Sequence, residues 1–139
     1  MAQAIEQVMT EKPLALAAGT TLTAAARAMR DHDVGDVIVL DEMDLRGIVT
    51  DRDLVVRGLA AGLDPTQAIL AEICSDEVIT VSPSDDVDHA VALMREHALR
   101  RLPVVNEGRP IGIVSLADLA VERDPDSALG RISDARPNR

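Results

Sequence analysis

The stretch GIVTDRDL at residues 47–54 is repeated in altered form as GIVSLADL at residues 112–119. Each copy runs from a glycine through two β-branched residues to a hydroxyl residue, and an aspartate follows three positions later. These residues are Thr50 and Asp53 in the first copy and Ser115 and Asp118 in the second. A hydroxyl residue followed by an acid three residues on is typical of a helix N-terminus with a capping box. The same hydroxyl and carboxylate could instead hold a ligand, so the motif alone leaves both interpretations open.

The repeat extends over most of the chain at a constant offset of 65 residues, as from Gly47 to Gly112. Because the offset never changes, the match does not depend on where gaps are placed. The coinciding apolar residues include Leu14 and Ile79, Leu22 and Val87, Met29 and Met94, and Val37 and Leu102. A solenoid needs at least three repeats, so two copies predict a pseudo-symmetric pair.

Each copy predicts the order β-α-β-β-α, from apolar residues at helical spacing between short extended apolar runs. In the first copy we expect strands at 14–16, 37–40 and 47–49, with helices beginning at Leu22 and at the repeated motif. In the second copy we expect strands at 78–81, 102–105 and 112–114, with helices beginning at Val87 and at the motif. The predicted fold class is α+β, a tandem pair of β-α-β-β-α units with pseudo-two-fold symmetry.

The predicted boundaries place the first unit at residues 1–72, the second at 73–121 and a polar tail at 122–139. In the first unit the closing helix is expected to end near Gly62, and a short helix to begin after Pro65. For the tail we expect irregular structure with at most one helical turn. A unit of about fifty residues buries too little surface to be stable alone, so we expect the two units to pack as one module.

Composition limits the partners and the location. The chain has 139 residues and a net charge of −10, which argues against nucleic acid and against an anionic membrane surface. It has no aromatic residue, which excludes base stacking on aromatic rings. The apolar runs are too short for a membrane span, and the N-terminus does not read as a signal peptide. Cys74 is the single cysteine, so we expect a reducing, cytoplasmic location.

Cysteine and histidine offer little support for a metal site. His32 and His97 coincide under the offset, and each ends a predicted helix, where histidine interacts favourably with the C-terminal carbonyl groups. Cys74 occupies the position of Met9 in the first copy, which favours a buried small apolar residue. No zinc-type spacing is present, so we expect no metal.

These features together resemble a known family. Duplicated β-α-β-β-α units that end in G-h-h-[ST]-x-x-D-h, where h is apolar, resemble cystathionine-β-synthase (CBS) domains, which occur in tandem pairs. The stretch RRLPVV at 100–105 resembles the second-strand signature of that family, and the resemblance covers residues 6–121. The stretches at 21–35 and 49–65 are similar to an actinobacterial subgroup that includes hypoxic response proteins. We therefore expect a stand-alone CBS pair.

The resemblance implies a regulatory module that binds an adenine nucleotide (AMP, ADP or ATP) or S-adenosylmethionine in clefts between its units, and that forms a homodimer. In the family the motif aspartate holds the ribose hydroxyls, the motif Ser or Thr lies near ribose or phosphate, and a basic residue before the second strand meets phosphate. The implied nucleotide-binding residues here are Thr50, Asp53, Ser115, Asp118, Arg101, Arg52, Val81 and Val37. No cofactor is required. We expect no enzyme, since no nucleophile stands near a general base in a recognisable motif and no glycine-rich phosphate loop is present.

The residues alone do not decide whether the motif aspartates bind a ligand. Asp53 and Asp118 could bind a ribose diol, or they could complete a capping box. Capping boxes favour the longer Glu or Gln, which slightly favours the ligand interpretation. The first copy has Asp36 where the second has Arg101, and an acid at that position would repel a phosphate. We expect unequal sites, the better one using Arg101, with Arg52 either a second contact or a solvated surface residue. The alternative function is a structural or stress-response dimer that acts through protein contacts without binding nucleotide.

Overall fold

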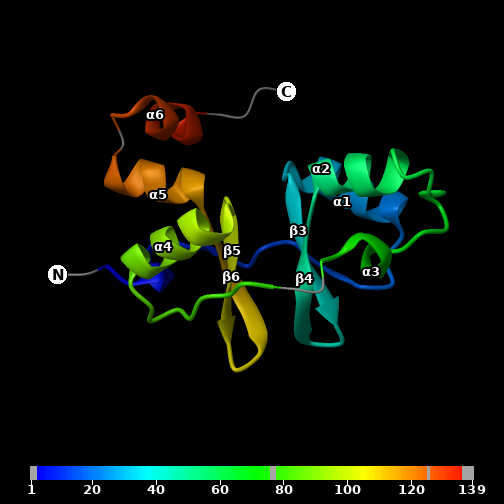
Figure 1. The fold of residues 1–139 in the computed structure, drawn as a ribbon, viewed down its shortest axis with the longest axis horizontal. Coiled ribbons are helices and arrows are strands. Elements are labelled where there is room, and N and C mark those ends of the chain that lie inside the picture. The colour runs from blue at the N-terminus through cyan, green and yellow to red at the C-terminus, as the bar shows by residue number, and fades with distance from the viewer. Residues whose placement is uncertain (1–2, 76–77, 125, 136–139) are drawn as a thin grey trace. The chain divides into compact units, whose positions relative to one another are not determined.

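The computed structural model describes residues 3–75, 78–124 and 126–135, and it repeats the order β-α-β-β-α (Figure 1). The first copy comprises β2 (Ala15–Ala17), α1 (Leu22–His32), β3 (Asp36–Asp41), β4 (Asp44–Thr50) and α2 (Asp51–Asp53), which continues as the π-helical segment η2 (Leu54–Leu59). The second comprises Val81 in a parallel bridge, α4 (Val87–His97), β5 (Arg101–Asn106), β6 (Arg109–Ser115) and α5 (Leu116–Arg123). Outside this order lie η1 (Ile5–Gln7), β1 (Thr10–Glu11), α3 (Leu70–Ile73) and α6 (Ala128–Asp134). The α+β prediction is confirmed.

The described residues divide into two compact units whose boundaries differ from those of the repeats. The α1 unit is made of Pro13–Val78 with Glu107–Pro110, and the α4 unit is made of Met1–Lys12, Ile79–Asn106 and Ile111–Arg139. Residues 3–12 therefore belong to the first repeat by sequence and to the α4 unit by packing.

The α1 unit is built on the sheet β2-β3-β4. Strand β2 runs parallel to β3, and β3 pairs antiparallel with β4 from Asp36 opposite Thr50 to Asp41 opposite Asp44. Thr21 caps the N-terminus of helix α1, and its side chain accepts a hydrogen bond from the backbone N–H of Ala24 at 3.2 Å. Its apolar stripe packs into a core that comprises Leu22, Ala25, Met29, Val37, Val39, Val49, Leu70 and Ile73. The predicted helical spacing is confirmed by this burial.

The α4 unit has the sheet β1-β6-β5. Strand β1 pairs antiparallel with β6, with Thr10 opposite Ile113 and Glu11 opposite Gly112. Asp86 caps the N-terminus of helix α4, and its carboxylate accepts a hydrogen bond from the N–H of Asp88. The core comprises Ile5, Val81, Val87, Ala90, Met94, Leu102, Val104, Val114 and Leu119. Because Ile5 is fully buried there, the N-terminal segment is an integral part of this unit.

The segment that leads each repeat packs on the last strand of the other repeat. A Cβ atom on Gly112 would lie 2.6 Å from Met9 Sδ and 2.9 Å from the carbonyl oxygen of Thr10. A Cβ atom on Gly47 would meet Cys74 Sγ in the same way. Met9 and Cys74 are equivalent under the offset, so the arrangement is the same in both units. The glycine that opens each copy of the motif is thus explained by lack of room for a side chain.

Three local expectations differ from the structure in their bounds. The first strand lies at Ala15–Ala17, one residue later than expected, and of the strand expected at 78–81 only Val81 forms a bridge, to Val104. The short helix expected after Pro65 begins at Leu70, since residues 65–67 form a turn.

The prediction of at most one helical turn in the tail is wrong, because α6 has seven residues, about two turns. Ser127 explains this helix: its hydroxyl accepts from the N–H of Gly130 and donates to the carbonyl oxygen of Asp124.

Within the described ranges every helix is too short or too polar to span a bilayer.

Candidate functional site

Both copies of the repeated motif form capping boxes. In the first, Thr50 Oγ1 accepts from the N–H of Asp53 at 3.1 Å, and Asp53 Oδ2 accepts from the N–H of Thr50 at 2.9 Å. In the second, Ser115 Oγ accepts from the N–H of Asp118 at 3.0 Å, and Asp118 Oδ2 accepts from the N–H of Ser115 at 3.2 Å. The interpretation of the hydroxyl residues as helix caps is confirmed. Each aspartate closes its box with one oxygen, so the other oxygen decides what else it can bind.

The second carboxylate oxygens of the two aspartates differ in their surroundings. Asp53 Oδ1 lies 3.8 Å from Nε of Arg57, one helical turn further on. Within the described residues, the hydrogen bonds that the Asp118 carboxylate accepts all end on Oδ2, including a long one of 3.5 Å from the hydroxyl of Thr10 on β1. Oδ1 of Asp118 accepts none from the described part of the chain. Asp118 Oδ1 therefore accepts no hydrogen bond from the described residues, and Asp53 differs from it in having the Arg57 guanidinium 3.8 Å from its second oxygen.

Acidic residues gather where β3 begins and β4 ends. Asp36 lies opposite Thr50 in the β3–β4 register, and the N–H of Asp51 donates to the carbonyl oxygen of Gly35 at 2.9 Å. The Asp51 carboxylate lies over Gly35, with Oδ2 3.1 Å from the position that a Cβ atom would take. Together with Asp53 these acids give this end of the sheet a negative charge, which disfavours a phosphate group.

The equivalent place in the α4 unit carries two arginines. The N–H of Leu116 donates to the carbonyl oxygen of Arg100 at 2.7 Å, which places the start of β5 beside the start of α5. Arg101 follows as the first residue of β5 and is partly buried. Arg101 carries a positive charge at the position where the first copy has Asp36, so the charges of the two units are opposite at equivalent positions.

The remaining predicted site residues are Arg52, Val37 and Val81. Arg52 is exposed, and its backbone N–H donates to Asp51 Oδ1 at 2.8 Å. The side chains of Val37 and Val81 are buried in the cores of the α1 and α4 units respectively. Their role in nucleotide binding stays a prediction.

Thr10 and Arg57 were not identified from the sequence as site residues. Arg57 stands four residues after Asp53, the spacing at which oppositely charged side chains meet on a helix, so it could have been found. Thr10 could not, because it reaches Asp118 from 108 positions away in the sequence.

The remaining candidates have structural explanations. His32 Nδ1 lies 2.9 Å from the carbonyl oxygen of Ala28 in the last turn of α1, as predicted for a histidine at a helix C-terminus. Cys74 is buried in the core of the α1 unit, which confirms its interpretation as a small apolar residue. Among residues 3–75, 78–124 and 126–135, no group of three or more His, Cys, Asp or Glu side chains is placed to hold a metal ion.

Comparisons with known proteins bear on both units. Residues 5–58 and 70–123 match the sequence model of the CBS domain. The chain is 46% identical over 101 residues to hypoxic response protein 1 of Mycobacterium tuberculosis, an alignment that covers 72% of this chain and 71% of that protein.

Two solved structures show the same fold. The crystal structure of hypoxic response protein I with two coordinated zinc ions has 39% identity and a TM-score of 0.79, over 86% of this chain and 98% of that one. The CBS domain pair of protein MJ0100, in complex with 5′-methylthioadenosine and S-adenosylmethionine, has 24% identity and a TM-score of 0.75, over 85% of this chain and 97% of that one.

Proposed function

Since the chain belongs to the CBS domain family, we propose that it is a non-enzymatic regulatory module that binds an adenine nucleotide or S-adenosylmethionine. The observation that carries the proposal is the carboxylate of Asp118, which has one oxygen engaged in a capping box and the other available. A carboxylate with an available oxygen accepts hydrogen bonds from sugar hydroxyls, and both candidate ligands carry a ribose diol.

The surroundings of Asp118 suit the rest of a nucleotide. Helix α5 has eight residues, and its N-terminus beside Ser115 favours negative charge. Arg101 adds a cation at the start of β5. A phosphate would therefore be attracted by the α4 unit, and the diol of the same ligand would meet Asp118.

The two units are proposed to bind unequally. In the α1 unit the equivalent motif itself contains Asp51 and Asp53, Asp36 lies opposite Thr50, and Arg57 Nε lies 3.8 Å from the second oxygen of Asp53. A phosphate approaching there meets like charge, so the α4 unit is the preferred site. Arg52 is the basic residue within the motif of the α1 unit, so a phosphate bound in that unit would depend on contact with Arg52.

We also propose that the protein acts as a homodimer and that the ligand shifts its conformational equilibrium. A ligand can do so only to the extent that it binds one arrangement better than another. The second candidate function is a stress-response dimer that works through protein contacts without a ligand. It is favoured by the capping boxes, which give both aspartates a structural role, and it agrees with the similarity to hypoxic response protein 1.

A thermal-shift panel of AMP, ATP, S-adenosylmethionine and GMP separates these functions. Because the chain has no aromatic residue, unfolding is followed by far-ultraviolet circular dichroism. A ligand at a hundred times its Kd adds about 2.7 kcal/mol, which raises Tm by about 5–10 °C. The substitution Arg101→Ala should weaken the binding of AMP and ATP, because they carry phosphate, and should leave the binding of S-adenosylmethionine unchanged. No shift with any adenine ligand at millimolar concentration contradicts the proposal and favours the ligand-free dimer.

A further inference from the structure

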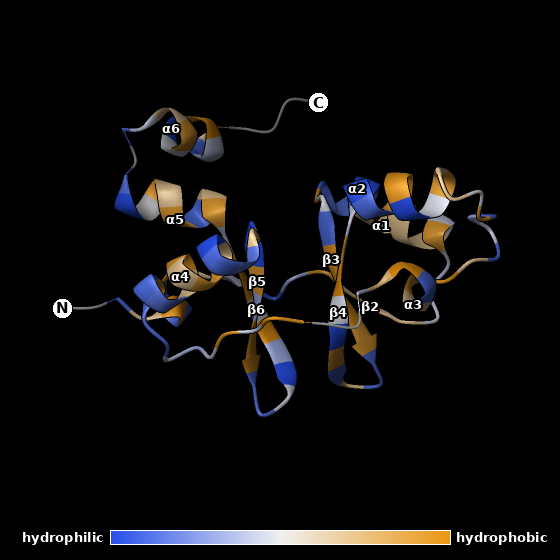
Figure 2. Cartoon of the chain, in the orientation of Figure 1, coloured by the Kyte–Doolittle hydropathy of each residue, from blue (hydrophilic) through white to orange (hydrophobic). Residues whose placement is uncertain are grey.

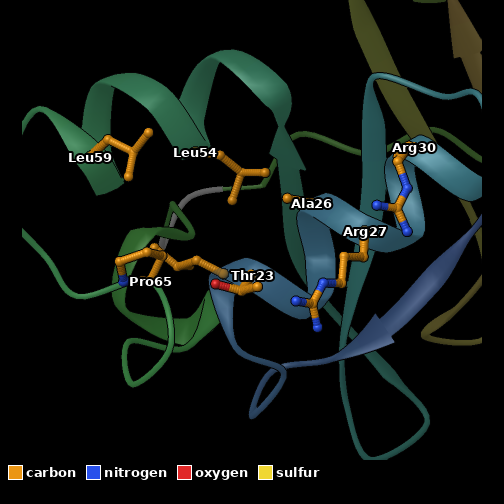
Figure 3. A pocket seen from close by; sticks show the side chains of 8 residues that line it. Thr23, Ala26, Arg27, Arg30, Leu54, Leu59 and Pro65 are labelled. Atoms are coloured by element: carbon orange, nitrogen blue, oxygen red, sulfur yellow. The ribbon is translucent and has the colours of Figure 1, made fainter.

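The helix that follows the motif in the α1 unit differs from its counterpart in the α4 unit. Segment η2 is π-helical, whereas α5 is an α-helix, and π-helical turns are rare and frequent at functional sites. Most of η2 is apolar, in contrast to α2 before it (Figure 2). Leu54 and Leu59 line a pocket of about 320 Å³ that η2 forms with α1 (Figure 3). Arg57, the one charged residue in the sequence of η2, does not line this pocket and makes its contacts elsewhere in the unit.

Two contacts hold the guanidinium group of Arg57. Nη1 donates a hydrogen bond of 3.2 Å to the carbonyl oxygen of Ile73, the last residue of α3. A carbonyl group in the last turn of a helix has no partner within that helix, so Arg57 supplies one. Nε lies 3.8 Å from Asp53 Oδ1, which is too far for a hydrogen bond but close enough for attraction between the charges. Arg57 therefore links the motif aspartate to the end of α3.

This position of the guanidinium group affects the oxygen of Asp53 that the capping box leaves for a ligand. Oδ2 accepts the hydrogen bond from the N–H of Thr50, so a ribose hydroxyl would donate to Oδ1. The hydroxyl hydrogen carries a partial positive charge, and it would approach Oδ1 beside a cation that is already held there by α3. The diol and Arg57 therefore compete for the same oxygen.

The α4 unit lacks this arrangement. At the offset of 65 residues, Glu122 takes the place of Arg57, so no arginine stands four residues after Asp118. The next residue, Arg123, pairs with Asp88 on α4 at 2.6 Å. Asp118 Oδ1 accepts no hydrogen bond from the part of the chain that the structure describes. A single position of the repeat thus separates the surroundings of the two motif aspartates.

We propose that Arg57 is a specificity-determining residue that competes with a ribose diol for Asp53 Oδ1 and makes the α1 unit the weaker nucleoside site. The inference rests on the function proposed above, in which the motif aspartates bind ribose. It adds a cause that does not involve phosphate: the acids of the α1 unit disfavour a phosphate group, whereas Arg57 also disfavours a nucleoside that has none. A partly exposed ion pair changes an equilibrium constant by up to about fivefold, which sets the size of the effect.

A nuclear magnetic resonance titration with adenosine tests the proposal, because adenosine carries the diol and no phosphate. The amide signals of Asp53 and Asp118 report on the two units separately, since both N–H groups donate within the capping boxes. Arg57→Leu should lower the Kd of the α1 unit about twofold to fivefold and leave that of the α4 unit unchanged. Arg27→Leu is the matched control, since it removes the same charge from α1 and should change neither Kd. An unchanged or higher Kd in the α1 unit of Arg57→Leu overturns the proposal.

The reverse substitution in the α4 unit keeps the proposal testable if loss of the hydrogen bond to Ile73 unfolds Arg57→Leu. Glu122→Arg places a guanidinium group four residues after Asp118 on an α-helix, and it should raise the Kd of the α4 unit about twofold to fivefold. Glu122→Gln is its control, since it removes the charge of Glu122 without adding a guanidinium group. Equal Kd values for these two variants overturn the proposal.

The same titrations distinguish this proposal from the proposed function. Adenosine binding at Asp118, with no binding in the α1 unit of any variant, overturns the role of Arg57 and keeps the proposed function. No response of the wild type in either unit at millimolar adenosine overturns both.

Discussion

The packing of β1 on β6 predicts a specific cost for the substitution Gly112→Ala. The added Cβ would lie 2.6 Å from Met9 Sδ and 2.9 Å from the carbonyl oxygen of Thr10. The methionine side chain can move, but the carbonyl oxygen belongs to a strand fixed by pairing of Glu11 with Gly112. The strands must therefore separate, and overpacking of this kind costs about 1–3 kcal/mol. We expect Tm to fall by about 3–10 °C.

Urea unfolding followed by far-ultraviolet circular dichroism measures this cost. Gly19→Ala is the control, because nothing lies within 4 Å of its Cβ position and its φ is not positive. That variant should be unchanged or more stable by about 0.4–1 kcal/mol, through a less flexible unfolded chain. If Gly112→Ala is as stable as Gly19→Ala, residues 9–11 do not pack on β6, and the account of the exchanged segments is wrong.

Two other predictions follow from hydrogen bonds. Ser115→Ala and Thr50→Ala remove the capping hydroxyls, and each should lower the free energy of unfolding in urea by about 1 kcal/mol. The controls Ser115→Thr and Thr50→Ser keep a hydroxyl and should leave this free energy unchanged. Equal stability of all four variants would contradict the caps. The pKa of Asp64 is lowered because the hydroxyl and the N–H of Thr66 both donate hydrogen bonds to its Oδ1. These bonds therefore stabilise the folded protein at neutral pH, and this stabilisation is lost as the pH falls through the lowered pKa. Thr66→Ala should raise the pKa of Asp64 in a nuclear magnetic resonance titration, and an unchanged value would refute this cause.

The parts of the fold that are local in sequence were predictable. Apolar residues at helical spacing predict helices α1 and α4, and the motif residues Thr50 and Ser115 predict the helices that they cap. These features depend on neighbours a few positions apart, where spacing determines which side chains meet.

The exchange of the N-terminal segments was not predictable from the repeat. The offset shows that Met9 corresponds to Cys74, but it says nothing about which glycine each residue packs on. The same limit applies to Thr10, whose contact with Asp118 joins the two ends of the chain. In the tail, Ser127 is a recognisable helix cap, and α6 was missed because the polar composition was given more weight than that local signal.

For the candidate site, the unequal ligand binding of the two copies stays a prediction from the sequence, and the structure adds the geometry of the two capping aspartates. The opposite charges of Asp36 and Arg101 are visible in the aligned repeats. No spacing rule provides the side-chain positions that leave Asp118 Oδ1 without a hydrogen bond and place Arg57 near Asp53.

The most direct test of the central claim is isothermal titration calorimetry of AMP, ATP and S-adenosylmethionine with the wild type, Asp118→Asn and Asp53→Asn. Asparagine keeps a carbonyl oxygen that can accept the capping hydrogen bond, so the helix start is preserved while the carboxylate is lost. The account predicts that at least one adenine ligand binds, that Asp118→Asn weakens it about tenfold or more, and that Asp53→Asn has the smaller effect. Equal affinity of the wild type and Asp118→Asn, or no binding at millimolar ligand, would contradict it.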